Sequence, residues 1–258
     1  MVARSGLTGP CRAVPSCCKI DLVMCSNYRA VTQSDRLLQF FGVMREKNQP
    51  PVDTWPLGLA PFIRLHEDGS GNRVCDDGIF GLLPHFQTEM AAGRKTYNAR
   101  SETVATLASY RESWKKGWRC IIPAELIYEP NWETGKAVRW SIQLADRYAM
   151  GIAGIYRKWT GPDGNQAFTF AMLTVNANGH PVMQRFHKPG EEKRMVVLLA
   201  PQEYGAWLSC SVDEAPRFFK QWTGSLVAQP APLPPRAPNT SSGRSVVPPP
   251  KDDNGQLF

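Results

Sequence analysis

The sequence predicts an α+β domain whose sheet is largely antiparallel. Strand-like apolar runs are numerous, and turn-forming pieces such as Gly161-Pro162-Asp163-Gly164 separate them. Stretches with a helical apolar period are few and scattered. The chain has 258 residues, of which 42% are hydrophobic and 21% charged, so it can bury a core of its own.

The expected strands cover residues 138–144, 148–156, 167–175 and 195–199. Helices are expected at residues 34–41, 101–116 and 202–208. Ser34 and Ser101 are positioned to cap the first two helices. Leu37, Leu38 and Phe41 would share one face of the first helix, and the inward-facing positions of the second would be Val104, Leu107, Ala108 and Trp114.

The chain divides into three parts by composition. Residues 1–23 lack any apolar stretch or period, and we expect a disordered or misassigned N-terminal extension. Residues 24–228 carry the aromatic-rich, periodic sequence of a single folded domain. Residues 229–258 form an expected Pro-rich disordered tail, because eight of the 22 prolines fall between Pro230 and Pro250.

Charge and cysteine usage limit the possible functions. The net charge of +7 permits a polyanionic partner without requiring one. Seven cysteines are present without a CxxC pair, which argues against a zinc site or a disulfide framework and favours a reducing cytoplasm. No apolar run approaches the ~20 residues that span a bilayer. We therefore expect no metal, no cofactor and no membrane partner.

Four short stretches carry candidate chemistry. They are Met24-Cys25-Ser26-Asn27-Tyr28, residues 97–103 (YNARSET), residues 119–129 (RCIIPAELIYE), and Arg185-Phe186-His187-Lys188-Pro189 followed by Lys193-Arg194-Met195. Each is weak alone, since a cysteine is commonly a small core residue and an exposed acid or histidine is commonly only solvated. Their order and spacing together are specific.

From Met24 to about Trp207 the chain resembles the SRAP family, the SOS-response-associated peptidases. The family begins Met-Cys, carries Asn-Ala-Arg-x-Glu-Thr, then a strand ending in Glu, and then a His shortly before Arg-Met. The resemblance implies one domain with a barrel-like β core and a few flanking helices. It also implies a DNA repair activity on single-stranded DNA that contains abasic sites, with self-processing peptidase activity and strand-cleaving lyase activity.

The residue chemistry supports this reading independently. An abasic site exposes a sugar aldehyde, which a primary amine attacks to give a Schiff base. An N-terminal cysteine goes further, because its thiol closes onto the imine carbon as a five-membered thiazolidine. Its α-amine has a pKa of ~7.7–8.0 and is partly neutral near pH 7. Cys25 would have to become the first residue, since residues before it would convert that amine to an amide.

The resemblance also implies roles for individual residues. Glu129 would orient the amine and move its protons, His187 would act as acid or base at the sugar, and Asn98 would hold the amine or a sugar oxygen. With Cys25 these form the catalytic set. The DNA-binding set comprises Asn27, His85, Phe86, Arg100, Glu102 and Thr103. Within it, Arg100 would hold a phosphate, while His85 and Phe86 would form a wedge beside the lesion.

The chain departs from the family at several positions. Asn27 stands where family members commonly have an arginine, and Pro130 follows Glu129 in place of an aromatic residue. Residues 189–192 lengthen the segment between the histidine and Arg194-Met195. A rival histidine, His180, lies seven residues upstream of His187. His187 is preferred because it leads into the Arg-Met signature.

Two other functions remain open from the sequence. A thiol peptidase acting on other proteins would pair Cys25 with His187 as nucleophile and base. A non-catalytic module would bind single strands through basic and aromatic residues alone. In each case we expect a cytoplasmic monomer, located at the nucleoid when it acts on DNA. The C-terminal Gln256-Leu257-Phe258 weakly resembles motifs that dock on a sliding clamp.

Overall fold

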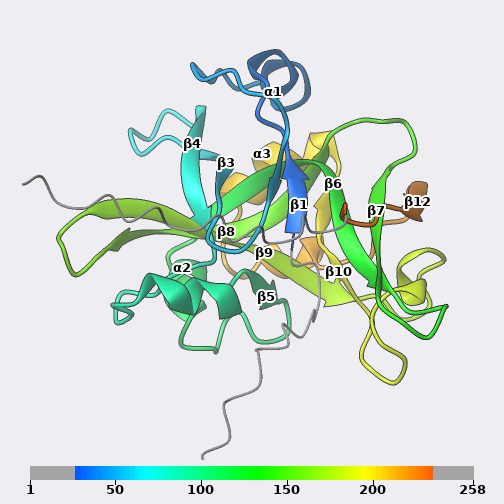
Figure 1. Ribbon diagram of the computed structural model, residues 1–258. Coiled ribbons are helices and arrows are strands. Elements are labelled where there is room, and N and C mark those ends of the chain that lie inside the picture. The colour runs from blue at the N-terminus through cyan, green and yellow to red at the C-terminus, as the bar shows by residue number, and fades with distance from the viewer. Residues whose placement is uncertain (1–26, 235–258) are drawn as a thin grey trace, which may run out of the picture.

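The computed structural model describes residues 27–234, whose twelve strands belong to one sheet (Figure 1). The strands are β1 (Asn27–Ala30), β2 (Val52–Thr54), β3 (Leu59–Leu65), β4 (Arg73–Phe80), β5 (Asn98–Arg100), β6 (Arg119–Asn131), β7 (Val138–Leu144), β8 (Met150–Thr160), β9 (Gln166–Asn176), β10 (Arg194–Val196), β11 (Leu198–Leu199) and β12 (Leu226–Pro230). The helices are α1 (Ser34–Phe41), α2 (Arg111–Lys115) and α3 (Tyr204–Ser209), with short 3-10 turns η1 (Met90–Lys95), η2 (Met183–Arg185), η3 (Pro201–Glu203) and η4 (Ala215–Phe218).

Five of these strands close into a barrel. The ring runs β8–β9–β4–β3–β6 and returns from β6 to β8. All of its pairings are antiparallel except β4 with β9. The predicted α+β class with a largely antiparallel, barrel-like core is therefore confirmed. The sheet continues from β6 beyond the ring, through β1 and β2 on one side and through β7 and β12 on the other. The C-terminal end of β6 therefore has neighbouring strands on both sides.

Aromatic residues fill the barrel interior. The rings of Phe80 and Phe62 each lie 5.6 Å from that of Phe170, and all three are fully buried. Where β6, β8 and β9 meet, the backbones approach closely at Gly154. A Cβ there would lie 2.6 Å from Cδ1 of Ile122 and 2.8 Å from the carbonyl oxygen of Ala171, so only glycine fits.

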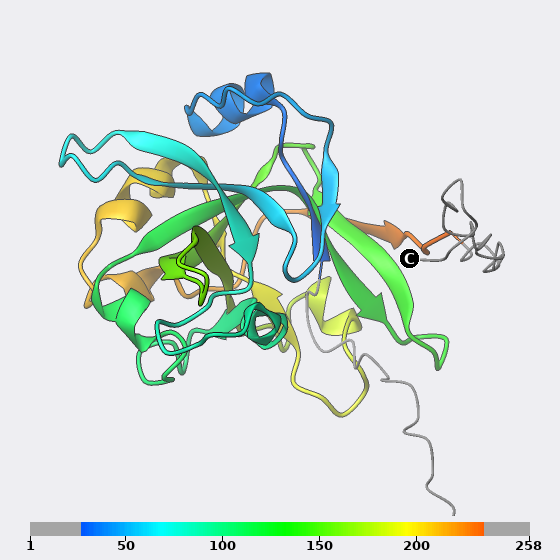
Figure 2. The ribbon, with the colours of Figure 1, turned by 60° about the vertical axis from the view of Figure 1, so that its left-hand side comes forward.

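Helix α1 confirms the first predicted helix, with the same bounds. It lies at the opposite end of the barrel from α2 in the two views (Figures 1 and 2). The capping role predicted for Ser34 is wrong: the N-cap position is Gln33, and the Ser34 hydroxyl donates to the carbonyl of Arg45 at 2.7 Å. The third predicted helix appears as η3 followed by α3.

The predicted helix at residues 101–116 is largely wrong. Only α2 at its end is helical, and residues 101–110 form successive turns. This segment contains β-branched Thr103, Val104 and Thr106, which lose side-chain freedom in a helix. Val104 and Trp114 are buried as expected, whereas Leu107 is 46% exposed.

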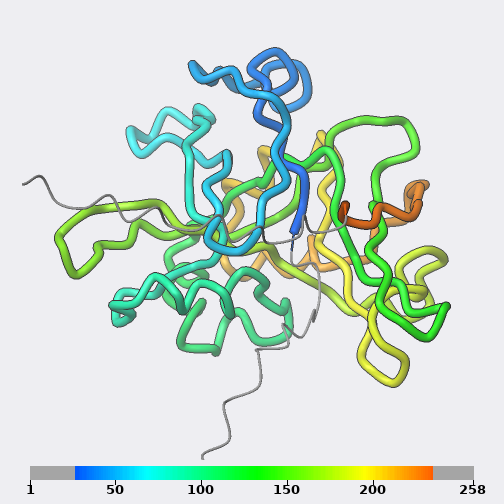
Figure 3. The backbone as a smooth tube through the Cα atoms, viewed as in Figure 1, coloured from blue at the N-terminus to red at the C-terminus, as the bar shows by residue number. Residues whose placement is uncertain are grey.

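The predicted strand at residues 195–199 is present as two strands. β10 pairs with β9, and β11 pairs with β8. Val197 lies between them, donating to the carbonyl of Leu173 and accepting from the amide of Ala153. The chain therefore bridges two neighbouring strands of the barrel. This stretch belongs to the yellow part of the tube in Figure 3. Across residues 27–234, no helix has the length and apolar character needed to cross a membrane.

Candidate active site

Glu129 lies near the C-terminal end of β6. At that end the strand is flanked by β1 and β7, with Tyr128 opposite Asn27 and Glu129 opposite Trp140. Because side chains alternate along a strand, Glu129 shares a face with Ile127, which is in the core. Glu129 is consequently only 2% exposed, an unusual environment for a carboxylate.

His187 reaches Glu129 from the segment after η2. Asn131 and Phe186 form an isolated antiparallel bridge, and the His187 amide donates to the carbonyl of Pro130 at 3.0 Å. His187 has φ of +65°, a left-handed conformation that side chains other than glycine and asparagine rarely adopt. Nζ of Lys193 donates to the carbonyls of His187 and Lys188 at 3.0 and 3.1 Å. These two hydrogen bonds stabilise the turn of the backbone at His187.

Nε2 of His187 lies 3.3 Å from Oε2 of Glu129. The two atoms are in ion-pair range but are not aligned as a hydrogen bond, and no other described group hydrogen-bonds to either atom. Burial lowers the pKa of His187, but the charge and proximity of Glu129 outweigh burial, so the pKa is raised above its ordinary value. The site thus holds a proton donor and a carboxylate with free hydrogen-bonding capacity.

An opening beside Glu129 has a volume of about 120 Å³. Its walls include Asn27, Trp55, Tyr128 and Arg139. Arg139 lies over the Tyr128 ring at 3.2 Å from the centroid and donates to Asp53 at 2.8 Å. Asn27 and Glu129, both predicted site residues, therefore line one cavity, whose outer wall is aromatic and basic.

The predicted Asn-Ala-Arg segment forms β5, parallel to β9. Asn98 is its first residue and is half-buried, and its carbonyl accepts the Tyr110 hydroxyl at 2.9 Å. Arg100 is exposed, and its guanidinium is engaged by Glu192 at 2.7 Å. Glu192 belongs to the segment that lengthens this chain relative to the family pattern.

Buried Arg194 links this segment to the histidine segment. Its guanidinium donates to both carboxylate oxygens of Glu102, at 2.8 and 2.9 Å, and to Glu192 at 2.8 Å. Glu102, predicted to contact DNA, thus has an internal partner. Thr103 is half-buried, and its hydroxyl makes no hydrogen bond among residues 27–234.

His85 and Phe86 lie in the loop after β4. Phe86 is 56% exposed, and the two rings meet edge to face at 5.4 Å. Nδ1 of His85 lies 2.8 Å from Oε2 of Glu112. With Trp114 and Lys115 these residues line a surface pocket of about 650 Å³. The wedge role expected for His85 and Phe86 stays a prediction.

The described cysteines are poor nucleophiles. Cys120 is fully buried and Cys75 is half-buried; burial raises the pKa of both thiols, for Cys75 to about 12. Burial also raises the pKa of Cys210. A reactive cysteine requires the opposite shift. Cys25, the predicted nucleophile, lies outside the described residues.

Sequence reasoning singled out the stretches that contain Lys193 and Glu192 but gave neither residue a role in the site. Both lie in the segment following His187, and their contacts depend on how that segment folds back. The only signal in the sequence was the extra length between the histidine and Arg194-Met195. It showed that something was added, without showing what the added residues contact.

Known proteins resemble this chain over nearly the whole described part. The SOS response associated peptidase (SRAP) family model matches residues 24–230. The abasic site processing protein YoqW of Bacillus subtilis (strain 168) is 28% identical over 191 residues, covering 72% of this chain and 80% of that protein. The abasic site processing protein HMCES of Gallus gallus is 27% identical over 153 residues, covering 51% of this chain and 46% of that protein. A crystal structure of a protein from Bordetella bronchiseptica matches with a TM-score of 0.74 and 35% identity, covering 81% of this chain and 100% of that one.

Proposed function

The chain belongs to the SOS response associated peptidase (SRAP) family, and from that premise we propose that it processes abasic sites in single-stranded DNA by forming a covalent bond through Cys25. The observation that carries the proposal is the buried pair of Glu129 and His187, 3.3 Å apart. Asn27, the first residue of β1, lines the same cavity as Glu129. Two peptide units separate Cys25 from Asn27, so their Cα atoms are at most about 7.6 Å apart.

The reaction needs one proton acceptor and one proton donor. The α-amine of Cys25 attacks C1′ of the ring-opened sugar, and Glu129 accepts the proton that the nitrogen loses. His187 protonates the departing oxygen, so the carbinolamine loses water and becomes an imine. Sγ of Cys25 then adds to the imine carbon and its proton passes to nitrogen, which closes the thiazolidine. The net change is aldehyde plus aminothiol giving thiazolidine plus one water.

The same site suits the other activities proposed for the chain. If residues precede Cys25, its thiol attacks the carbonyl of residue 24, the amide nitrogen leaves as an amine, and water hydrolyses the thioester. That autoproteolysis releases the amine that the crosslink requires. Elimination of the 3′ phosphate from the imine, before the ring closes, would give lyase activity. A peptidase acting on other proteins would use the same thiol and histidine, but no contact among the described residues favours it.

DNA contacts are proposed for residues around this pair. Arg100 would hold a phosphate once Glu192 releases it, because a guanidinium fork matches a phosphate. Phe86 and His85 would stack against a base beside the lesion. Asn27 would contact the strand at the cavity, and Asn98 the sugar or amine. The proposed docking of Gln256-Leu257-Phe258 on a sliding clamp concerns residues outside the described ones.

A crosslinking assay tests the proposal. Protein whose intact mass corresponds to a chain beginning at Cys25 is incubated with a single-stranded oligonucleotide containing an abasic site, then run on a denaturing gel. A shifted band is expected. Cys25→Ala should abolish it while leaving non-covalent binding within about twofold, since only the thiol is lost. Molecules whose intact mass shows that Met24 is still attached should bind without crosslinking, because an amide nitrogen is not nucleophilic. Wild-type yield from Cys25→Ala would refute the mechanism.

A further inference from the structure

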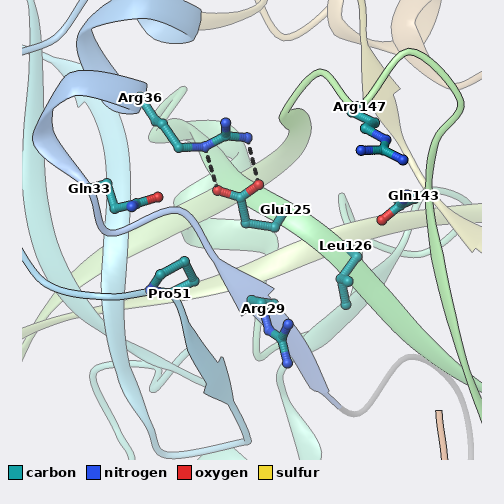
Figure 4. A pocket seen from close by; sticks show the side chains of 8 residues that line it. All are labelled: Arg29, Gln33, Arg36, Pro51, Glu125, Leu126, Gln143 and Arg147. Carbon is teal, nitrogen blue, oxygen red and sulfur yellow. Dashed lines mark hydrogen bonds and ion pairs between the residues drawn. The ribbon is translucent and has the colours of Figure 1, made fainter.

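A separate basic pocket lies beside β1 and β6, on the side of α1 (Figure 4). Its volume is about 510 Å³. Three of its lining residues are arginines from three different segments: Arg29 of β1, Arg36 of α1, and Arg147 of the turn between β7 and β8. The remaining lining residues are Gln33, Pro51, Glu125, Leu126 and Gln143. Only one acid therefore faces three guanidinium groups.

That acid is already neutralised. Nε and one terminal nitrogen of Arg36 donate to the two carboxylate oxygens of Glu125, at 2.7 and 2.6 Å. Arg29 donates to Asp53 through Nε alone, which leaves its terminal nitrogens without a hydrogen bond among residues 27–234. The Arg147 side chain makes no hydrogen bond or ion pair to any described residue. Unused donors from two arginines therefore remain beside a satisfied ion pair.

Arg147 is also held in an unfavourable backbone conformation. Its φ is +60°, which costs a residue other than glycine or asparagine roughly 1–2 kcal/mol. The turn does not use its side chain: the Arg147 amide donates to Leu144, and the Asp146 carboxylate accepts from the amide of Tyr148. The guanidinium instead faces the opening that contains Gln143 and the Arg36–Glu125 pair (Figure 4). Strained backbone positions of this kind are enriched at functional sites.

We propose that this pocket binds a backbone phosphate of the DNA strand where the strand leaves the abasic site. The inference rests on the proposed function and names a second contact for the same substrate. Guanidinium groups from separate segments that line one pocket offer several donors to the oxygens of a phosphate, and each can bind it bidentately. The amides of Gln33 and Gln143 add neutral donors at the rim.

The location suits a phosphate a few nucleotides from the lesion. Arg29 follows Asn27 by two residues on β1, a rise of about 7 Å along the strand. Opposite Arg29 on β6 is Leu126, three residues or about 10 Å from Glu129. One strand of a duplex carries one charge per about 3.4 Å of helix axis, and a single strand bound at that spacing would cover this separation with two or three nucleotides.

Salt-dependent binding tests the proposal. The ligand is a single-stranded oligonucleotide with an abasic analogue that lacks the aldehyde, so that only non-covalent binding is measured. Arg147→Asn removes the charge and suits the left-handed backbone, so its Tm should equal or exceed that of the wild type. The slope of log K against log salt should fall in magnitude by about 0.7, the value for one phosphate contact on a single strand. The control Arg217→Gln also removes one exposed positive charge, in η4, and should leave the slope unchanged.

Strand length distinguishes the possible sources of phosphate. The difference in salt slope between Arg147→Asn and the wild type should appear with oligonucleotides that extend past the lesion on one side. It should vanish with oligonucleotides that end at the lesion on that side. Equal slopes for all strands overturn the inference. A second result would also overturn it. If inorganic phosphate stabilises the wild type but not Arg147→Asn against thermal unfolding, and the salt slopes of the two proteins are equal, the pocket binds free phosphate and not the DNA strand. Crosslinking of a short abasic oligonucleotide by the wild type reports separately on the proposed function.

Discussion

Nε2 of His187 lies 3.3 Å from Oε2 of Glu129, and both side chains are at most 2% exposed. Within the described part of the chain, the pair depends on a bend at His187 that Lys193 fastens and on a strand end that β1 and β7 enclose. Buried charged groups are costly unless they are paired. Glu129 therefore favours the protonated form of His187, and the pH dependence of the proposed reaction follows from this contact.

The rate of crosslinking should depend on pH as a bell-shaped curve. The acid limb arises because the Cys25 amine, with a pKa of ~7.7–8.0, must be neutral. The alkaline limb arises because His187 must be protonated, and its protonated form is lost as pH rises through its raised pKa. Glu129, Lys193 and Glu191 are the charged groups that act on it, and Glu129 has the largest charge effect.

Glu129→Gln should therefore move the alkaline limb to lower pH. Without the carboxylate, burial dominates and lowers the His187 pKa. Loss of the proton acceptor should also reduce the maximal rate by about 10²-fold or more. Single-turnover rates across the pH range measure both effects. An unchanged alkaline limb would show that another group supplies the proton.

His187→Asn should slow crosslinking by about 10²-fold or more while leaving the fold intact. Asparagine tolerates the left-handed backbone of this position, so little stability should be lost. The matched control is His180→Asn. His180 lies 2.8 Å from the carbonyl of Trp222 and accepts the amides of Val182 and Met183, so its loss should destabilise by about 1–3 kcal/mol. Normal crosslinking by His187→Asn, with a defect in folded His180→Asn, would reverse the assignment.

Glu192→Gln should strengthen non-covalent binding of single-stranded DNA by about two- to fivefold. The carboxylate occupies Arg100 at 2.7 Å, and an exposed ion pair of this kind is worth about 0–1 kcal/mol. Buried Arg194 retains its two bonds to Glu102, so the fold should survive. The matched control is Glu191→Gln, which also removes one negative charge. Glu191 makes no ion pair with an arginine among the described residues. Equal gains from both variants would mean that only net charge matters.

Removing residues 235–258 should leave Tm and crosslinking unchanged, whereas ending the chain after Ser225 should destabilise it. β12 pairs with β7 along five residues, from Leu226 opposite Leu144 to Pro230 opposite Trp140. Arg139 also donates to the carbonyl of Ala231 at 3.2 Å. Loss of about 1 kcal/mol would lower Tm by about 2–4 °C in a domain of this size. Thermal unfolding of both truncations provides the comparison, and an equal Tm would deny β12 a structural role.

Local patterns predicted many elements because their cause is local. α1 has its apolar residues on one face, and β7 alternates clearly enough to be located to the residue. The segment at residues 101–116 failed because its contacts are distant. Glu102 pairs with Arg194, 92 residues away, and such pairing overrides a helical pattern. The split of residues 195–199 into β10 and β11 likewise requires two partner strands that sequence spacing does not reveal.

For the site, the sequence alone determined which residue types are available and in what order: a thiol at Cys25, a carboxyl group at Glu129 and an imidazole at His187. It did so because these residues stand at the positions of the family pattern. Only the tertiary structure decided that Glu129 and His187 meet in a buried contact, that Glu192 occupies Arg100, and that Arg147 faces a second basic pocket. Those relationships join segments up to 118 residues apart, from residue 29 to residue 147, and they exist only once the barrel has closed and set the register of its strands.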